Sequence, residues 1–169
     1  LAADNIVINE VMYNPANDGT PEWIELHNQM AVDMDLSTWQ LRGGVNFTFP
    51  VGTIIPRQGY LVISADPTAL AAHGFTGALG PWTGSLDNDG ELITLANNSD
   101  RPLSELQYGD DGGWPVAPDG AGPSLAKRLK NSAVDYPENW SASAQIDGTP
   151  GAENFPPAVL RRSDDLRLL

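Results

Sequence analysis

Three glutamates near the start of the chain have a spacing that could bring carboxylates together. Glu10 lies in an apolar stretch at residues 5–12, and Glu22 and Glu25 lie in a second such stretch at residues 22–28. A buried carboxylate needs an arginine, backbone N–H groups or a cation as its partner. These glutamates could bind a divalent metal ion, act as a catalytic pair, or accept hydrogen bonds from loop backbones and fix the first hairpin. We favour the last, structural interpretation.

The alternation of side chains along a strand predicts which residues accompany these glutamates. Glu10 should share a face with Ile8, and Glu22 should share a face with Ile24. If both faces point inward, Glu10 and Glu22 approach each other at the edge of the core. The pattern leaves the inward face of the first stretch open, because three alternate residues could occupy it instead: Val7, Asn9 and Val11.

A second group of acidic residues alternates around a glycine turn. Asp87, Asp89 and Glu91 supply oxygen ligands of the kind that calcium binds. The complete EF-hand spacing is missing, and Asn-Asp-Gly is an ordinary hairpin turn, so we expect a turn here. A calcium ion, the one cofactor that the sequence admits, would be bound by Asp87 and Asp89, or by Glu10 and Glu22.

Few other residues point to hydrolytic chemistry. The chain has no cysteine, which excludes thiol nucleophiles, thiolate metal sites and disulfides. His27 and His73 are its only histidines, and they lack the spacing of a zinc site. No serine lies in a nucleophile elbow, and no loop has the pattern that binds phosphate. We therefore expect no catalytic residues. A third interpretation, a hydrolase, predicts a deep pocket that joins Glu10, Glu25 and His27.

Tryptophans are the other candidate binding residues. The chain has five, of which Trp82 and Trp114 lie in or beside predicted loops. Exposed aromatic rings can stack on sugars or anchor a protein partner, whereas buried rings cover the open ends of a sandwich. We take Trp82 and Trp114 as candidate ligand-binding residues, and Trp39 and Trp140 as core or loop anchors.

Composition excludes several classes of partner. The formal net charge is −13, from 9 basic and 22 acidic residues. This charge repels nucleic acid phosphates and anionic lipid surfaces, so we expect neither as a partner. No apolar run approaches the roughly 20 residues of a membrane-spanning helix, so membrane insertion is not expected.

Short apolar stretches separated by Gly, Pro, Asn and Asp predict an all-β chain with one short helix. Asp66 and Pro67 have the character of the N-cap and first-turn residues of that helix, at residues 68–73. Residues 75–82, 110–122 and 132–143 are expected to be loops or irregular. The predicted strands number about nine, at residues 5–12, 22–28, 38–42, 46–49, 60–64, 82–86, 91–96, 103–108 and 124–129.

These elements predict an immunoglobulin-like antiparallel β-sandwich over residues 1–154. Pro156-Pro157 and the patternless residues that follow predict that residues 155–169 are a linker or the start of a following domain. The abrupt start at Leu1 indicates a processed terminus or a segment cut from a longer protein.

Six motifs, in this order, resemble the bacterial form of the lamin tail domain. The resemblance covers roughly residues 6–154, nearly the whole chain. Each motif is weak alone, but six in register are specific. They are Ile8-Asn9-Glu10-Val11, Glu22-Trp23-Ile24-Glu25-Leu26-His27-Asn28, Asp35-Leu36-Ser37-Thr38-Trp39, Phe47-Thr48-Phe49-Pro50-Val51-Gly52-Thr53, Gly59-Tyr60-Leu61-Val62-Ile63 and Gly148-Thr149-Pro150-Gly151.

This resemblance implies an immunoglobulin-like module of a larger secreted, periplasmic or cell-surface bacterial protein. Such modules accompany catalytic domains and are regarded as non-catalytic, with a proposed role in tethering. The coiled-coil rod and the prenylation signal of the eukaryotic relatives are absent from this sequence, so filament assembly and nuclear-envelope attachment do not carry over.

We therefore interpret the chain as a non-catalytic binding or tethering module, either a monomer or a weak homo-oligomer. Its expected partner is a protein or a cell-surface polymer. The alternative is a calcium-stabilised carbohydrate-binding β-sandwich, which loop tryptophans and a bound cation would support.

Overall fold

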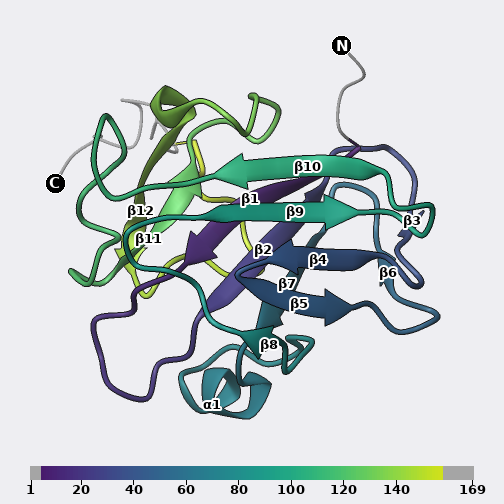
Figure 1. Ribbon diagram of the computed structural model, residues 1–169, viewed down its shortest axis with the longest axis horizontal. Helices are drawn as coiled ribbons and strands as arrows, with labels where there is room; N and C mark the ends of the chain where they lie inside the picture. Colours follow the sequence, from purple (N-terminus) through teal and green to yellow (C-terminus); the bar gives the residue numbers. More distant parts are fainter. Residues whose placement is uncertain (1–4, 158–169) are drawn as a thin grey trace, which may run out of the picture.

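Two antiparallel five-stranded sheets pack face to face in the computed structural model, which describes residues 5–157 (Figure 1). The first strand of the chain lies in the middle of the first sheet. One of its neighbours is the next strand in sequence, and the other comes from the last third of the chain. In spatial order this sheet contains β12 (Trp140–Ile146), β11 (Pro123–Lys127), β1 (Ile6–Met12), β2 (Trp23–Asn28) and β7 (Tyr60–Ser64).

The second sheet is built from the middle of the chain. In spatial order it contains β10 (Pro102–Gln107), β9 (Leu92–Ala96), β4 (Gln40–Gly43), β5 (Val45–Thr48) and β8 (Thr83–Gly84). A separate two-stranded ribbon pairs β3 (Met34–Asp35) with β6 (Ile54–Ile55). The helical elements are α1 (Pro67–Ala72) and the short 3-10 helix η1 (Pro137–Asn139).

The predicted antiparallel β-sandwich with one short α-helix is confirmed, with a larger number of strands. Residues 5–157 form twelve strands, where we expected about nine. The additional strands are β3, β6 and β12, and the stretch at residues 82–86 contributes only the two residues of β8. The strands β3 and β6 have two residues each, too few to produce an alternating pattern.

The prediction that residues 132–143 are irregular is wrong for their last part, which begins β12. The strand reads Trp-Ser-Ala-Ser-Ala-Gln-Ile, a sequence poor in the β-branched residues that favour strands. Its extended conformation is stabilised by pairing with β11, where Lys127 lies opposite Trp140, and by burial of the Trp140 ring. Tertiary packing therefore overrides a weak local preference.

The strands β1 and β2 are buried along their whole length because both faces of the first sheet are covered. The inner face packs against the second sheet through an apolar core that includes Ile8, Ile24 and Leu95. On the outer face, Trp23 joins a separate apolar cluster with Leu70 of α1.

The helix α1 begins as its sequence predicts. The carboxylate of Asp66 accepts a hydrogen bond from the backbone N–H of Ala69 at 2.9 Å, and Pro67 occupies the first turn. Among residues 5–157, no helix is long and apolar enough to cross a membrane.

A β-bulge at Asn9 changes the face on which Glu10 lies. The register of β1 against β2 pairs Ile8 with Leu26 but Glu10 with Glu25, so one extra residue is accommodated in β1. Ile8 and Val11 can then both enter the core, and Glu10 turns away from it. The expectation that Glu10 shares a face with Ile8 is therefore wrong, because strict alternation does not hold across a bulge.

Candidate functional site

Glu10 and Glu25 face each other across β1 and β2 and are the most chemically unusual residues of the fold. They are cross-strand partners, and both side chains have no exposed surface. What covers them is the segment Gly148–Asn154, which we name the strap. The strap follows β12, returns to the middle of the first sheet, and carries no secondary structure other than turns.

The carboxylate of Glu10 binds the beginning of the strap with both oxygens. Its Oε1 accepts hydrogen bonds from the backbone N–H of Thr149 at 2.8 Å and from Ser124 Oγ at 2.5 Å. Its Oε2 accepts a hydrogen bond from Thr149 Oγ1 at 2.9 Å. Three donors from β11 and the strap therefore hold this buried carboxylate.

The carboxylate of Glu25 binds the middle of the strap. Its Oε2 accepts a hydrogen bond from the backbone N–H of Gly151 at 2.6 Å, and its Oε1 accepts one from Asn9 Nδ2 at 2.9 Å. The bulged residue Asn9 thus aims its amide at the partner carboxylate, which gives the bulge a clear structural role.

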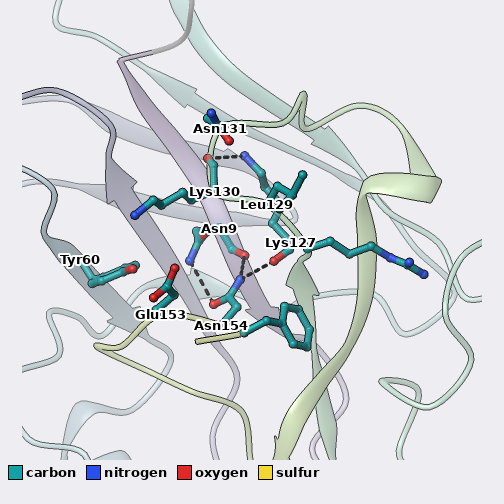
Figure 2. Close-up of a pocket in the computed structure, with 10 residues that line it drawn as sticks. Asn9, Tyr60, Lys127, Leu129, Lys130, Asn131, Glu153 and Asn154 are labelled. Atoms are coloured by element: carbon teal, nitrogen blue, oxygen red, sulfur yellow. Dashed lines mark hydrogen bonds between the residues drawn. The ribbon is translucent and has the colours of Figure 1, made fainter. Parts of the chain in front are cut away.

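Asn154 fastens the end of the strap to the two strands beneath it (Figure 2). Its Nδ2 donates to the carbonyl oxygens of Asn9 and Lys127, each at 3.0 Å. Its Oδ1 accepts a hydrogen bond from Asn9 Nδ2 at 3.1 Å. One buried amide therefore joins β1, β11 and the strap.

Two strap glycines are required by the closeness of this packing. Gly148 has a φ of +79°, and a Cβ there would lie 2.7 Å from both Glu10 Oε1 and Trp23 Cζ2. Gly151 also has a φ of +79°, and its Cβ would lie 2.8 Å from Phe75 Cε2. Any other residue would meet both an unfavourable backbone conformation and occupied space.

Burial of two facing carboxylates shifts their protonation equilibria. Removal from water raises the pKa of Glu25 to about 8, and the negative charge of Glu10 contributes to this rise. Burial also raises the pKa of Glu10, opposed by its hydrogen bonds from Ser124 and Thr149. Near neutral pH the pair therefore retains a proton.

His27 lies on the same strand as Glu25 but takes no part in this hydrogen-bonded network. Its ring stacks on Tyr60 with centroids 4.6 Å apart, and its Nδ1 donates to the carbonyl oxygen of Gly59 at 3.0 Å. Burial, followed by the nearby positive charges of Lys130 and Lys127, lowers the pKa of His27. The imidazole is thus neutral and serves as a packing residue.

Glu22 does not share the hydrogen-bond partners of Glu10 and binds the backbone just before the second acidic group. Its Oε2 accepts a hydrogen bond from the backbone N–H of Leu86 at 2.9 Å. Burial raises the pKa of Glu22, and the negative charge of Glu91 adds to the rise. The predicted approach of Glu10 to Glu22 is therefore wrong, because Glu25 is the residue that faces Glu10.

The carboxylates of the turn at residues 87–91 are largely engaged with the backbone of that turn. Asp87 Oδ1 accepts a hydrogen bond from the N–H of Asp89 at 3.0 Å, and Glu91 Oε1 accepts one from the N–H of Asp87 at 2.8 Å. Within residues 5–157, no group of three or more histidine, aspartate or glutamate residues has the arrangement of a metal site. The geometry is that of the hairpin turn that the sequence favours.

The two candidate tryptophans have little free surface for a ligand. Trp82 is 6% exposed and belongs to the core between the sheets. Trp114 is half-buried and packs against Trp140, with ring centroids 6.4 Å apart. Trp140 itself is buried, and its Nε1 donates to the carbonyl oxygen of Val134 at 2.8 Å.

A depression of about 150 Å³ opens on the outer side of the first sheet, beside the strap (Figure 2). Asn9, Lys127 and Asn154 line its inner part, and Lys130 and Glu153 line its rim. The carboxylates of Glu10 and Glu25 lie outside this lining. The depression is therefore separate from the buried acidic pair.

The sequence predicts Glu10 and Glu25 as members of one acidic group but does not identify the donors that hold them. These donors include Asn9, Ser124 and Thr149. The available signal was chemical rather than periodic: a glycine-rich Gly-Thr-Pro-Gly motif supplies backbone N–H groups at close approach, and two buried carboxylates need such donors.

Comparison with known proteins adds one positive finding. The family model described as Lamin Tail Domain matches residues 1–110. This segment contains β1 to β10, whereas β11, β12 and the strap follow it. No curated protein sequence matches the chain.

Proposed function

This chain belongs to the lamin tail domain family, and from that premise we propose that it is a non-catalytic module that binds a protein or a cell-surface polymer. The family is a non-enzymatic one with an immunoglobulin-like fold. By binding, the module would hold a neighbouring catalytic or adhesive domain close to its target. The motifs typical of bacterial members favour a secreted, periplasmic or cell-surface protein as its parent.

The closure of the acidic pair is the observation that supports this proposal most. A pair of facing glutamates with a raised pKa is what a hydrolase would use, provided that a substrate could reach it. Here the strap fills that space, and Thr149 and Gly151 occupy the carboxylate oxygens. Both side chains are fully buried. The pair therefore has a structural use, which is to attach the strap to the sheet.

The charge of the chain narrows the kind of partner. A net charge of −13 opposes association with nucleic acids and with anionic membranes. Proteins and neutral or basic polymers of the cell surface are compatible with it. We propose that the module works as a monomer or a weak homo-oligomer.

The proposal is tested by measuring turnover and binding on the same preparation. The purified 169-residue chain would be incubated with chromogenic ester, phosphoester and glycoside substrates, with and without divalent cations. The same protein, fluorescently labelled, would be titrated onto isolated bacterial cell envelopes before and after protease treatment. Saturable retention without turnover is the expected result.

Two results would contradict the proposal. The first is turnover that disappears in the Glu25→Gln variant, because it would make the buried pair catalytic. The second is labelled protein that is retained no better than a folded, equally acidic control protein. Retention that survives protease treatment would point to the polymer and retention that does not would point to a protein.

A further inference from the structure

We propose that the depression beside the strap binds a single carboxylate group of a protein partner. This inference rests on the proposed binding function and adds a location and a ligand chemistry to it. The ligand is either an acidic side chain or a chain-terminal carboxylate, two sources that present the same planar anion. Figure 2 shows the residues that line the depression.

The size of the depression selects a small group. Its volume is about 150 Å³, and it is open to solvent on one side. Clefts that enclose a whole small-molecule ligand are larger, typically about 300–1,000 Å³. A carboxylate with one or two methylene groups fits this space while the rest of the partner remains outside, as expected for one anchoring contact of a larger interface.

The charge of the depression selects an anion. Residues 5–157 contain six lysines and arginines, and three of them lie within four positions: Lys127, Arg128 and Lys130. All three line the depression. These three residues form a local positive cluster on a chain whose net charge is −13. Because the overall charge repels extended polyanions, an isolated carboxylate fits better than a polyphosphate backbone.

Hydrogen bonds to the backbone hold two of the three basic side chains of the depression in place. Lys127 is 1% exposed, and its Nζ donates to the carbonyl oxygen of Lys130 at 3.0 Å. This bond closes the turn after β11 and places Lys130 at the rim. Arg128 is held from the other side, because its Nε donates to the carbonyl oxygen of Trp140 at 3.2 Å.

Hydrogen-bonding groups and a competing charge complete the site. The phenol of Tyr60 and the amide of Asn131 border the same space, so a carboxylate would meet neutral polar donors as well as cations. The amides of Asn9 and Asn154 already donate both of their hydrogens within the protein. Between residues 5 and 157 the one salt bridge joins Arg42 to Asp100, which leaves Lys130 and Arg128 unpaired with a carboxylate of this part of the chain. Glu153 lies on the opposite rim and opposes an incoming anion.

The arrangement of the rim predicts opposite effects for two exposed residues. Lys130→Ala removes an attractive charge and should weaken carboxylate binding roughly two- to fivefold, the range of an exposed ion pair. Glu153→Gln removes a repulsive charge and should strengthen binding by a similar factor. Both side chains are exposed, so neither change removes packing. Arg101→Ala, in an exposed turn of the second sheet, is the matched control and should have no effect.

The test is a titration of isotope-labelled protein followed by NMR chemical shifts at constant ionic strength. The probes are N-acetylglycine for a chain-terminal carboxylate, N-acetylaspartate amide for an acidic side chain, and inorganic phosphate for other anions. We expect saturable shifts at residues 127–131 and 153–155 with one or both carboxylates, and the larger response identifies the source.

Three outcomes would overturn the inference: no saturable shift with either carboxylate, equal binding of phosphate, or equal affinities in the Lys130→Ala and Glu153→Gln variants. The proposed function is tested separately, by retention on cell envelopes. Retention that is unchanged in Lys130→Ala would leave the binding module in place and remove only this site.

Discussion

The acidic pair shows how environment determines the role of a residue. Glu10 and Glu25 have the side chains of general acids and bases, yet their oxygens are occupied by Ser124, Thr149 and Gly151. Each strap donor lies within 2.9 Å, so water is excluded from both carboxylates. The same burial that raises their pKa values also closes them to a substrate, which is why a shifted pKa alone does not identify a catalytic residue.

The raised pKa of Glu25 predicts that this residue makes the protein less stable as pH rises. The folded state holds the proton up to a pKa of about 8, whereas the reference value is 4.5. Between these values the folded state binds more protons, so the free energy of unfolding falls with increasing pH, by at most about 1.4 kcal/mol per pH unit. Glu10 has a shift of the same sign.

This pH dependence is measured best as a difference between two proteins. His27 has a lowered pKa and contributes the opposite slope, because it favours the folded state as pH rises. The free energies of unfolding of the wild type and of Glu25→Gln would be measured in urea between pH 5 and 8. Their difference cancels the contribution of His27, which both proteins share. The wild type should lose stability relative to the variant as pH increases, and a constant difference would contradict a protonated Glu25.

Asn154 is the second residue whose removal should be costly. Asn154→Ala leaves the buried carbonyl oxygens of Asn9 and Lys127 without their donor and removes an acceptor for Asn9 Nδ2. The expected loss is about 2–4 kcal/mol of unfolding free energy. Asn98→Ala, at an exposed turn position, is the control and should change stability by less than about 0.5 kcal/mol. Equal effects in chemical denaturation would remove the structural role that we assign to Asn154.

At the scale of elements, the first sheet depends on a segment that is not a strand. The strap covers the outer face of β1 and β2 where α1 does not reach, and it bonds to β1, β2 and β11. The bulge in β1 makes this possible, since it turns Glu10 outward while Ile8 and Val11 remain in the core. The bulge at Asn9 and the strap therefore act together to bury the two glutamates on the outer face of the first sheet.

Because the strap packs closely on the sheet, we expect a glycine-to-alanine substitution in the strap to lower stability more than one in an open loop. Gly148→Ala must accommodate a Cβ that would lie 2.7 Å from Glu10 Oε1 and Trp23 Cζ2, in addition to a φ of +79°. Gly77→Ala has a φ of +96° but no atom within 4 Å of the new Cβ, so it measures the backbone cost alone. Gly77→Ala should cost about 1 kcal/mol, and Gly148→Ala clearly more. Thermal unfolding that is the same for both variants would mean that the strap yields without loss.

At the scale of the whole molecule, unbalanced negative charge is the dominant electrostatic feature. The net charge is −13, and the salt bridge among residues 5–157, between Arg42 and Asp100, pairs one of the many carboxylates with a cation. Self-repulsion of this kind disfavours the compact state and is screened by salt. The carboxylates of the turn at residues 87–91 are already partly satisfied by backbone N–H groups.

These charges predict a general response to ions and not a response specific to calcium. Sodium chloride should raise the melting temperature of chelator-treated protein. Calcium and magnesium at equal millimolar concentration should raise it equally, because screening does not distinguish them. A clearly larger effect of calcium would show a specific site, since a cation that binds only the folded state stabilises it by mass action. That result would favour the calcium-stabilised carbohydrate-binding alternative.

The elements that the sequence predicts well are those with a strong local signal. The strand β7 is observed at residues 60–64 as predicted, and α1 follows from the Asp66 cap and Pro67. The strand β12 escapes prediction because Ser and Ala carry little strand preference, and its stability depends on β11. The Glu10–Glu25 pairing also escapes it, because it follows from a bulge whose residue, Asn9, bonds to Asn154, 145 residues away, and no local pattern signals such a contact.

The strap also has a consequence for the order in which the protein can form. Thr149 and Asn154 bond to residues 139 and 145 positions earlier, which leave the ribosome well before the strap does. Until the strap emerges, the two carboxylates of β1 and β2 remain open to water and lack their final donors. The first sheet can therefore be completed only after the strap has been synthesised, and contacts so distant in sequence close slowly. Closure of the first sheet by the strap is thus a late step of folding, and a nascent chain that stops before residue 148 would be a natural substrate for chaperones.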